Sequence, residues 1–221
     1  SIGGKNGVNV ADYKNMVGTF RQPRFVIADV EMLRTLPKRE LHAGMAEVVK
    51  SAIIADAALF ERLERCGEAI YDSVEELQEA MLGAVAVKAR IVAEDEREGG
   101  VRRLLNLGHT LGHAIEKCTH DVNHGEGVAI GMSLVAHAAV RRGMLSEDVA
   151  QRIIGVAVSL GNITGINQTA DLGGGPGVGE IVVVVGFGIN FAGGWDNVVT
   201  NANSMPGFLE LFNTHDASAN A

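Results

Sequence analysis

Residues 38–55 read KRELHAGMAEVVKSAIIA, and the spacing of this stretch decides the fold class of the chain. Its apolar side chains, among them Leu41, Met45 and Val49, recur every three or four residues, as on one face of an α-helix. Pro37 suits the first turn of a helix, where its missing N–H leaves no bond unmade. The stretch therefore predicts a helix over residues 38–55.

The same helical pattern continues through most of the first 160 residues. Glycines and polar residues predict a loop over residues 1–20, and the β-branched run Phe25–Val30 predicts a short buried strand, followed by a turn over residues 32–35. Further helices are expected over residues 56–70, 74–97, 102–118, 124–143 and, capped by Ser146, 147–160. The fold class expected from this pattern is mainly α.

The composition changes near residue 161. Residues 161–221 contain no Lys or Arg and twelve Gly, and only Ile181–Val185 predicts a strand there, after a flexible loop at Gly173–Gly179. Such a composition allows either a disordered segment or a small β unit. We therefore divide the chain into residues 1–36, 37–160 and 161–221, the last of them unassigned.

Composition also limits the function classes. With 221 residues, 47% of them hydrophobic and 21% charged, the chain is expected to fold as a globular protein. Its longest apolar stretch is about half of the ~20 residues that a spanning helix needs, and no export leader opens it, so we expect no membrane partner. A net charge of −8 disfavours nucleic acid as a partner, and two cysteines fit a reducing cytoplasm.

Four side chains predict a metal site. His109 and His113 lie one helical turn apart, Glu47 is an acid in an apolar helical stretch, and His124 stands at a helix start. One carboxylate with two imidazoles is a catalytic metal set that leaves positions open for substrate; zinc suits it best, with cobalt or iron possible. The alternative is an ordinary pair of histidines on a helix surface.

Cations form a second group. Lys5 lies in a run of glycines (Gly3–Gly7) whose backbone N–H groups can approach an anion. Lys14, Lys50, Lys88 and Arg102 are the other candidates. The alternative for each is a solvated surface cation whose stem covers apolar neighbours.

Residues 1–160 resemble the later part of the 3-dehydroquinate synthases, enzymes of the shikimate pathway. The resemblance is carried by ordered strings of the sequence: SIGGK at 1–5, KNMVG at 14–18, AEVVK at 46–50, DERE at 95–98, LLNLGHT at 104–110 and HGE at 124–126. It implies the multihelical catalytic domain of a two-domain α/β + α enzyme. The N-terminal NAD-binding α/β domain is then expected to be largely missing. Residues 1–36 are expected to form the end of that domain together with the substrate loop.

The resemblance implies an activity and a role for each matched residue. The expected reaction is the NAD- and zinc-dependent conversion of 3-deoxy-D-arabino-heptulosonate 7-phosphate to 3-dehydroquinate, a lyase reaction that eliminates phosphate. The implied metal ligands are Glu47, His109 and His124. The implied catalytic residues are Lys50, Glu98 and His113. The implied substrate contacts are Lys5, Asn15, Lys88, Arg102 and Asn106. The implied NAD contacts are Lys5, Lys14, Met32, Leu33, Arg34 and Thr35.

Departures from the family pattern keep other hypotheses open. Asn6 replaces the family's usual Thr, and a substrate Lys that the family carries beyond residue 161 has no counterpart. The alternatives are a related sugar-phosphate cyclase that makes 2-deoxy-scyllo-inosose, a metal-dependent polyol dehydrogenase, and an inactive truncated metal-binding remnant. Lys88 and Arg102 favour 3-dehydroquinate synthase over these alternatives, because its substrate carries a carboxylate as well as a phosphate. A homodimer is expected.

Overall fold

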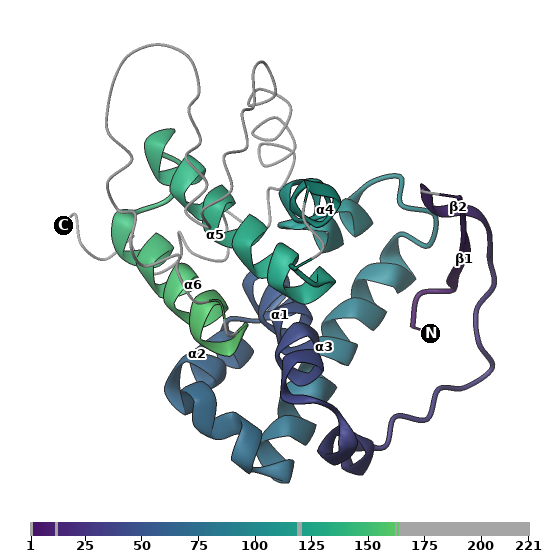
Figure 1. Ribbon diagram of the computed structural model, residues 1–221, viewed down its shortest axis with the longest axis horizontal. Helices are drawn as coiled ribbons and strands as arrows, with labels where there is room; N and C mark the ends of the chain where they lie inside the picture. The colour runs from purple at the N-terminus through teal and green to yellow at the C-terminus, as the bar shows by residue number, and fades with distance from the viewer. Residues whose placement is uncertain (1, 12, 119–120, 162, 164–221) are drawn as a thin grey trace.

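The computed structural model describes residues 2–11, 13–118, 121–161 and 163, and these are shown in colour in Figure 1. The predicted loop at Gly173–Gly179 and the predicted strand at Ile181–Val185 lie outside these residues. Among the described residues, no helix combines the length and the apolar character that crossing a bilayer requires.

The described body is helical, which confirms the predicted fold class. Two strands, β1 (Lys5–Val10) and β2 (Tyr13–Phe20), form the sheet of the described residues. The helices are η1 (Val30–Thr35), α1 (Lys38–Ala55), α2 (Ala57–Cys66), η2 (Gly67–Asp72), α3 (Val74–Glu94), η3 (Val101–Asn106), α4 (His109–Cys118), α5 (His124–Arg141) and α6 (Glu147–Leu160), where η marks a 3-10 helix.

Helix α1 is the centre of the core, and its bounds are those predicted from the sequence. It packs against α2, α3, α5 and α6 (Figure 1), and its side chains at Ala46, Val49 and Ile53 are fully buried. Burial of this apolar face at roughly 25 cal/mol per Å² is what holds the helices together. The polar residues of α1 that lie between its apolar positions are therefore held on a rigid element.

Two glycines let α5 approach its neighbours closely. A Cβ atom at Gly125 would lie 2.2 Å from the carbonyl oxygen of Ala43 in α1. A Cβ atom at Gly131 would lie 2.0 Å from the carbonyl oxygen of Gly108, just before α4. Because no side chain separates the backbones, the first turn of α5 lies beside α1 and the start of α4 lies beside the middle of α5.

The single helix predicted over residues 102–118 is wrong, since the structure has η3 and α4 there. The break falls at Gly108, whose φ of +77° belongs to the left-handed region that favours glycine. As a result, His109 is the first residue of α4. The predicted helix over 74–97 ends earlier, at Glu94, because the Asp95 carboxylate accepts hydrogen bonds from the backbone N–H groups of Gly99, Gly100 and Arg102.

The other helix ends follow ordinary capping. The predicted segment 56–70 divides into α2 and η2, with Asp56 capping α2 through the N–H of Leu59. Ser146 caps α6, as predicted, by accepting from the N–H of Val149. Asn123 and Glu126 form a capping box at the start of α5, so His124 is the first residue of that helix.

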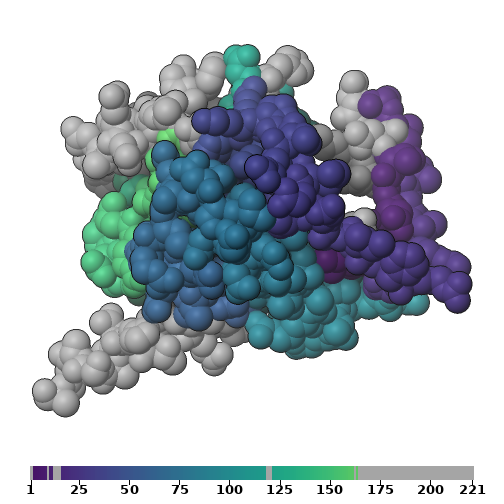
Figure 2. Space-filling view, turned by 90° about the horizontal axis from the view of Figure 1, so that it is seen from below, coloured from purple at the N-terminus to yellow at the C-terminus, as the bar shows by residue number. Residues whose placement is uncertain are grey.

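The N-terminal segment differs from its prediction in three places. The predicted loop over residues 1–20 is an antiparallel hairpin of β1 and β2, in which Gly7 pairs with Gly18. The prediction of a buried strand over Phe25–Val30 is wrong, because no described strand lies beside this run to pair its backbone. The run is not buried either, since Phe25 is 76% exposed. The predicted turn over residues 32–35 is part of η1. Figure 2 shows this purple segment on the side of the molecule away from α6, which is green.

Candidate metal centre and anion site

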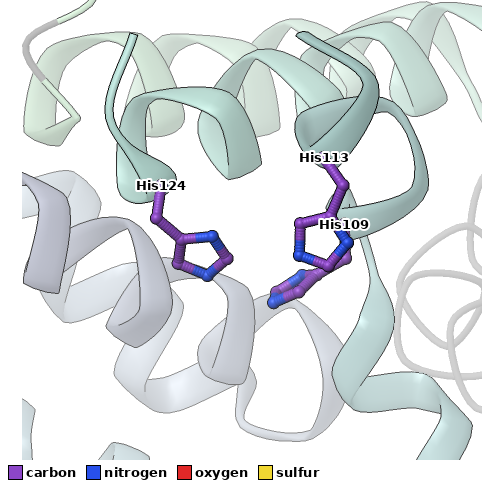
Figure 3. A group of neighbouring side chains, drawn as sticks. All are labelled: His109, His113 and His124. Carbon is purple, nitrogen blue, oxygen red and sulfur yellow. The ribbon is translucent and has the colours of Figure 1, made fainter. Parts of the chain in front are cut away.

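Helices α1, α4 and α5 bring the four predicted metal-site residues together. The three histidine rings point toward one another (Figure 3), and His109, His113 and His124 each offer a ring nitrogen within 4.8 Å of the others. The ring centroids of His109 and His124 are 5.1 Å apart. The interpretation of His109 and His113 as an ordinary surface pair is therefore not sufficient, because a third histidine from another helix meets them.

Glu47 completes the group from α1. Its Oε1 atom lies 3.5 Å from His109 Nε2 and 3.6 Å from His124 Nε2. Its other oxygen, Oε2, accepts a hydrogen bond of 2.6 Å from Lys50 Nζ. In the described part of the chain, Oε1 is buried and accepts no hydrogen bond. A buried carboxylate oxygen without a donor, facing two imidazole nitrogens, fits a divalent cation.

The electrostatics of Glu47 and His109 agree with ligand character, whereas the carboxylates of Glu47 and Glu116 raise the pKa of His124. Burial by itself would raise the pKa of Glu47, but His124 and the positive charge of Lys50 outweigh it and lower that pKa, so the carboxylate is ionised. Burial, with a further effect of Lys50, lowers the pKa of His109 to about 4. His109 is therefore neutral near pH 7, which is the protonation state that binds metal.

Contacts behind the site orient two of the rings. His109 Nδ1 lies 3.2 Å from the carbonyl oxygen of Leu107, which directs Nε2 toward Glu47. His124 Nδ1 lies 3.4 Å from Glu116 Oε2. Glu116 is absent from the predicted set, although its position three residues after His113 on the same helix face was a usable signal.

Arg39 is a second residue that the sequence did not mark. Its guanidinium contacts both carboxylate oxygens of Glu126 at 2.7 Å and also donates to the carbonyl of Asp121. Glu126 belongs to the capping box with Asn123, so Arg39 ties the start of α5 to α1. The pattern Asn-x-x-Glu at 123–126 was the signal for this arrangement.

Lys50 and Lys88 place positive charge beside the carboxylate. Lys50 is 4% exposed, and burial lowers its pKa while Glu47 opposes that effect. The positive charge of half-buried Lys88 on α3 lowers the pKa of Lys50 further. The two positive charges favour the binding of an anion in this part of the molecule.

A second group of predicted residues meets at Glu98. Its carboxylate pairs with Lys5 at the start of β1 and accepts a 2.8 Å hydrogen bond from Asn106 Nδ2. Glu98 adopts a φ of +62°, which is unusual for a residue other than glycine. The turn between α3 and η3 therefore draws the N-terminal hairpin and the end of η3 together.

Arg102 donates hydrogen bonds to backbone carbonyls in this structure. It is 3% exposed, and its guanidinium donates to the carbonyl of Gly3, at 2.7 Å, and to the carbonyl of Glu96. These bonds fasten the N-terminal segment to the turn after α3. The substrate contact expected of Arg102 stays a prediction.

The residues expected to contact NAD lie on β1, β2 and η1, whereas the metal-site residues lie on α1, α4 and α5. Lys14 and Asn15 belong to β2, and their side chains lie outside what the structure describes. The four residues 32–35 belong to η1, which lies beside α3, and Arg34 pairs there with Glu31 at 3.0 Å. Their role in binding NAD, like Asn15's in binding substrate, stays a prediction.

Solved structures with this fold define the class of protein. The structure matches 2-epi-5-epi-valiolone synthase from Streptomyces hygroscopicus subsp. jinggangensis 5008, with NAD+ and Zn2+ bound, at a TM-score of 0.67 and 32% identity, over 73% of this chain and 46% of that one. It also matches 2-deoxy-scyllo-inosose synthase complexed with carbaglucose-6-phosphate, NAD+ and Co2+, at a TM-score of 0.66 and 31% identity, over 73% and 45% of the two chains. The chain therefore has the fold of the helical part of these two synthases.

The family within that class follows from the sequence matches. Residues 1–43 match the pattern of the 3-dehydroquinate synthase N-terminal domain, and residues 44–172 match that of its C-terminal domain. The chain belongs to the 3-dehydroquinate synthase family, as the resemblance in its sequence indicated.

Two individual relatives support this family assignment. The 3-dehydroquinate synthase of Synechococcus sp. (strain CC9605) is 50% identical over 157 residues, which cover 69% of this chain and 42% of the relative. That of Rhodospirillum rubrum is 51% identical over 158 residues, 69% of this chain and 41% of the relative. The chain thus spans less than half the length of these relatives.

Proposed function

We propose that this chain is the metal- and substrate-binding part of a 3-dehydroquinate synthase. The reaction would convert 3-deoxy-D-arabino-heptulosonate 7-phosphate to 3-dehydroquinate with elimination of phosphate, using NAD and Zn2+, with Co2+ as a possible substitute. The observation that carries this proposal is the buried Glu47 Oε1, which faces His109 Nε2 and His124 Nε2 and accepts no hydrogen bond from the described residues. The expected identity of the substrate comes from the family relationship.

Glu47, His109 and His124 would hold the metal ion. When bound, the ion supplies Lewis acidity toward substrate hydroxyls, and NAD supplies a reversible acceptor for a hydride. The chain's own contribution is to fix the ligands before the ion arrives. Lys50 fixes the Glu47 carboxylate through Oε2, and the Leu107 carbonyl fixes the His109 ring through Nδ1. Little reorganisation is then needed on binding, which favours tight and selective coordination.

The cations would bind and orient the two anionic ends of the substrate. Lys50 and Lys88 stand beside the metal ligands and suit an anionic group close to the ring hydroxyls. Lys5 and Asn106 meet at Glu98, where a substrate anion would compete with that carboxylate for the Lys5 ammonium. His113, whose ring centroid is 5.3 Å from that of His109, borders the centre and is in position to hold or move a proton at a substrate oxygen.

Metal retention tests the first part of the proposal. Glu47→Ala and His109→Ala are each expected to abolish the binding of one zinc per chain, because each removes a ligand. Zinc content after dialysis is the measurement. Glu40→Ala is the matched control, since Glu40 is an exposed acid of the same helix α1. Unchanged zinc content in both ligand variants would refute the metal assignment.

Substrate choice tests the second part. Lys88→Ala is expected to weaken binding of 3-deoxy-D-arabino-heptulosonate 7-phosphate more than binding of glucose 6-phosphate, because only the first carries a carboxylate. Titration calorimetry of the zinc-loaded chain with each compound is the measurement. Lys38→Ala, which removes an exposed cation at the start of α1, should change neither affinity. Equal losses for both compounds would remove this reason for preferring the synthase.

A second candidate is the synthesis of 2-deoxy-scyllo-inosose from glucose 6-phosphate. The fold match at a TM-score of 0.66 favours it, whereas the 50–51% identity with 3-dehydroquinate synthases, against 31%, favours the first candidate. Turnover of glucose 6-phosphate by the zinc-loaded chain with NAD would support the second. Zinc binding with no phosphate release from either compound would indicate the truncated metal-binding remnant.

We place the protein in the cytoplasm, and Cys66, which is a free thiol, supports a reducing compartment. The homodimer stays a prediction, which light scattering coupled to size-exclusion chromatography tests directly.

A further inference from the structure

We propose that Glu116 is a positioning residue of the metal centre, which holds the His124 ring so that Nε2 faces Glu47 and His109. This inference rests on the proposed function, because it assumes that a metal ion binds at these side chains. It adds a residue that acts on a ligand without binding the ion itself.

Two carboxylates contact opposite edges of the His124 ring. Nε2 lies 3.6 Å from Glu47 Oε1, and Nδ1 lies 3.4 Å from Glu116 Oε2. The His124 side chain is 46% exposed, whereas the Glu116 side chain is only 10% exposed. Glu47 contacts this half-exposed ring only at Nε2, so the more deeply buried Glu116 adds a contact at its opposite edge.

The packing of α4 on α5 brings Glu116 to this place. Glu116 follows His109 by seven residues and His113 by three, so all three share one face of α4. The backbones meet at Gly112 and Gly127, where a Cβ atom on Gly112 would lie 2.8 Å from the Gly127 carbonyl oxygen. Glu116 Cγ would be 3.4 Å from a Cβ atom on Gly127. The Glu116 side chain therefore runs along the first turn of α5 toward His124.

The chemistry of the contact selects one form of the imidazole. A neutral imidazole carries one N–H, and an ionised carboxylate only accepts hydrogen bonds. The proton is then held on Nδ1, toward Glu116, and the lone pair of Nε2 is left for a cation. His109 achieves the same form with the Leu107 carbonyl at 3.2 Å from its Nδ1. Acceptors behind metal-binding histidines commonly have this function.

The test measures the zinc affinity of the whole chain by competition with a chromophoric chelator. Glu116→Ala is expected to weaken zinc binding roughly 10–100-fold. Glu116→Gln is expected to lose less, because its amide oxygen still accepts a hydrogen bond from Nδ1 and the side chain keeps its packing on Gly127. Glu61→Ala, which removes an exposed acid of α2, is the control and should keep the affinity of the unaltered chain.

A second background separates positioning from general support of the fold. A His124→Ala chain lacks a ligand and is not expected to bind zinc, so the measurement there is the free energy of unfolding in urea. Adding Glu116→Ala to it should cause no further loss of that free energy, since the ring that Glu116 holds is gone. A loss of unfolding free energy from Glu116→Ala that is equal with and without His124 would show a structural role and overturn the inference. Unchanged affinity in Glu116→Ala would also overturn it while leaving the proposed function intact. Failure of the unaltered chain to bind zinc would overturn both.

Discussion

The helical body and the N-terminal segment of this chain are held in different ways. In α1, residues such as Ala46 and Val49 are fully buried, and Glu47 of the metal site projects from the same helix. Among the residues of 2–36 whose burial the structure describes, the buried positions are Gly3 and Gly4, and large apolar side chains such as Ile27 are exposed. The metal half of the site is thus built by helix packing, whereas the hairpin that carries Lys5 depends on a small number of polar contacts.

Those contacts join segments far apart in the sequence. Lys5 pairs with Glu98, Gln22 Nε2 donates to Glu96 Oε1 at 2.9 Å, and Arg102 donates to the Gly3 carbonyl. The exposed contacts of Lys5 and Gln22 are each worth at most about 1 kcal/mol and those of the buried Arg102 guanidinium about 1.5–3 kcal/mol, less than the burial of a core helix face. We therefore expect that the two halves of the site can be disturbed separately.

The largest effect is expected where the helical body has no spare room. Gly131→Ala places a Cβ atom 2.0 Å from the Gly108 carbonyl oxygen, so α5 must move away from α4. We expect a loss of roughly 3 kcal/mol in the free energy of unfolding, together with loss of zinc binding. Urea unfolding monitored by circular dichroism measures the first.

Gly155 on α6 provides the matched control. A Cβ atom there meets nothing within 4 Å, so Gly155→Ala is expected to stabilise the protein by up to about 1 kcal/mol. Equal destabilisation by the two substitutions would contradict the packing argument.

A smaller effect, confined to the other half, is expected from Arg102→Ala. The substitution leaves the carbonyls of Gly3 and Glu96 without their buried donor, at a cost of about 1–3 kcal/mol. Hydrogen exchange should become faster in β1 and β2, while the zinc affinity stays within about twofold of the unaltered chain, because α1, α4 and α5 are untouched. A parallel loss of zinc affinity would show that the two halves are coupled, and the comparison would fail.

The smallest effect is expected from an ion pair on the surface of the body. Arg152 on α6 contacts Glu64 on α2 at 2.7 Å, and this hydrogen bond lowers the pKa of Glu64. A carboxyl whose pKa is depressed on folding contributes stability above its unfolded pKa, about 4.3, and loses it as the pH falls through the folded value.

Arg152→Gln should therefore lower the thermal unfolding midpoint slightly at pH 7 and progressively less as the pH falls below about 4.3. The effect is small because both side chains are more than one third exposed and solvent screens the pair. A difference between the two proteins that grows as the pH falls would contradict this sign.

How far the sequence predicts the fold depends on where each interaction is made. The periodicity of residues 38–55 placed α1 to the residue, and Ser146 placed the start of α6, because both signals are local. The break at Gly108 was missed, since a glycine inside a helical pattern does not reveal its φ. The run Phe25–Val30 misled because a strand needs a neighbour, which composition does not supply.

The site shows the same division. Glu47, His109 and His124 could be selected from residue types and from family resemblance, and the structure brings them together. Glu116 shares a face of its helix with His113, which the sequence shows, but its contact with His124 depends on how closely α4 packs on α5. Spacing along one helix is visible in a sequence, whereas the distance between two helices is set by packing.

The positions of His109 and His124 at the first residues of α4 and α5 have a further consequence. Helices α4 and α5 run antiparallel, because Gly131 of α5 lies against Gly108 before α4, whereas Glu116 near the end of α4 lies against Gly127 at the start of α5. The two N-terminal ends therefore lie about two turns of α5 apart, with one histidine at each. The aligned peptide dipoles of each helix leave partial positive charge at its own N-terminal end, which favours an anionic group near either histidine.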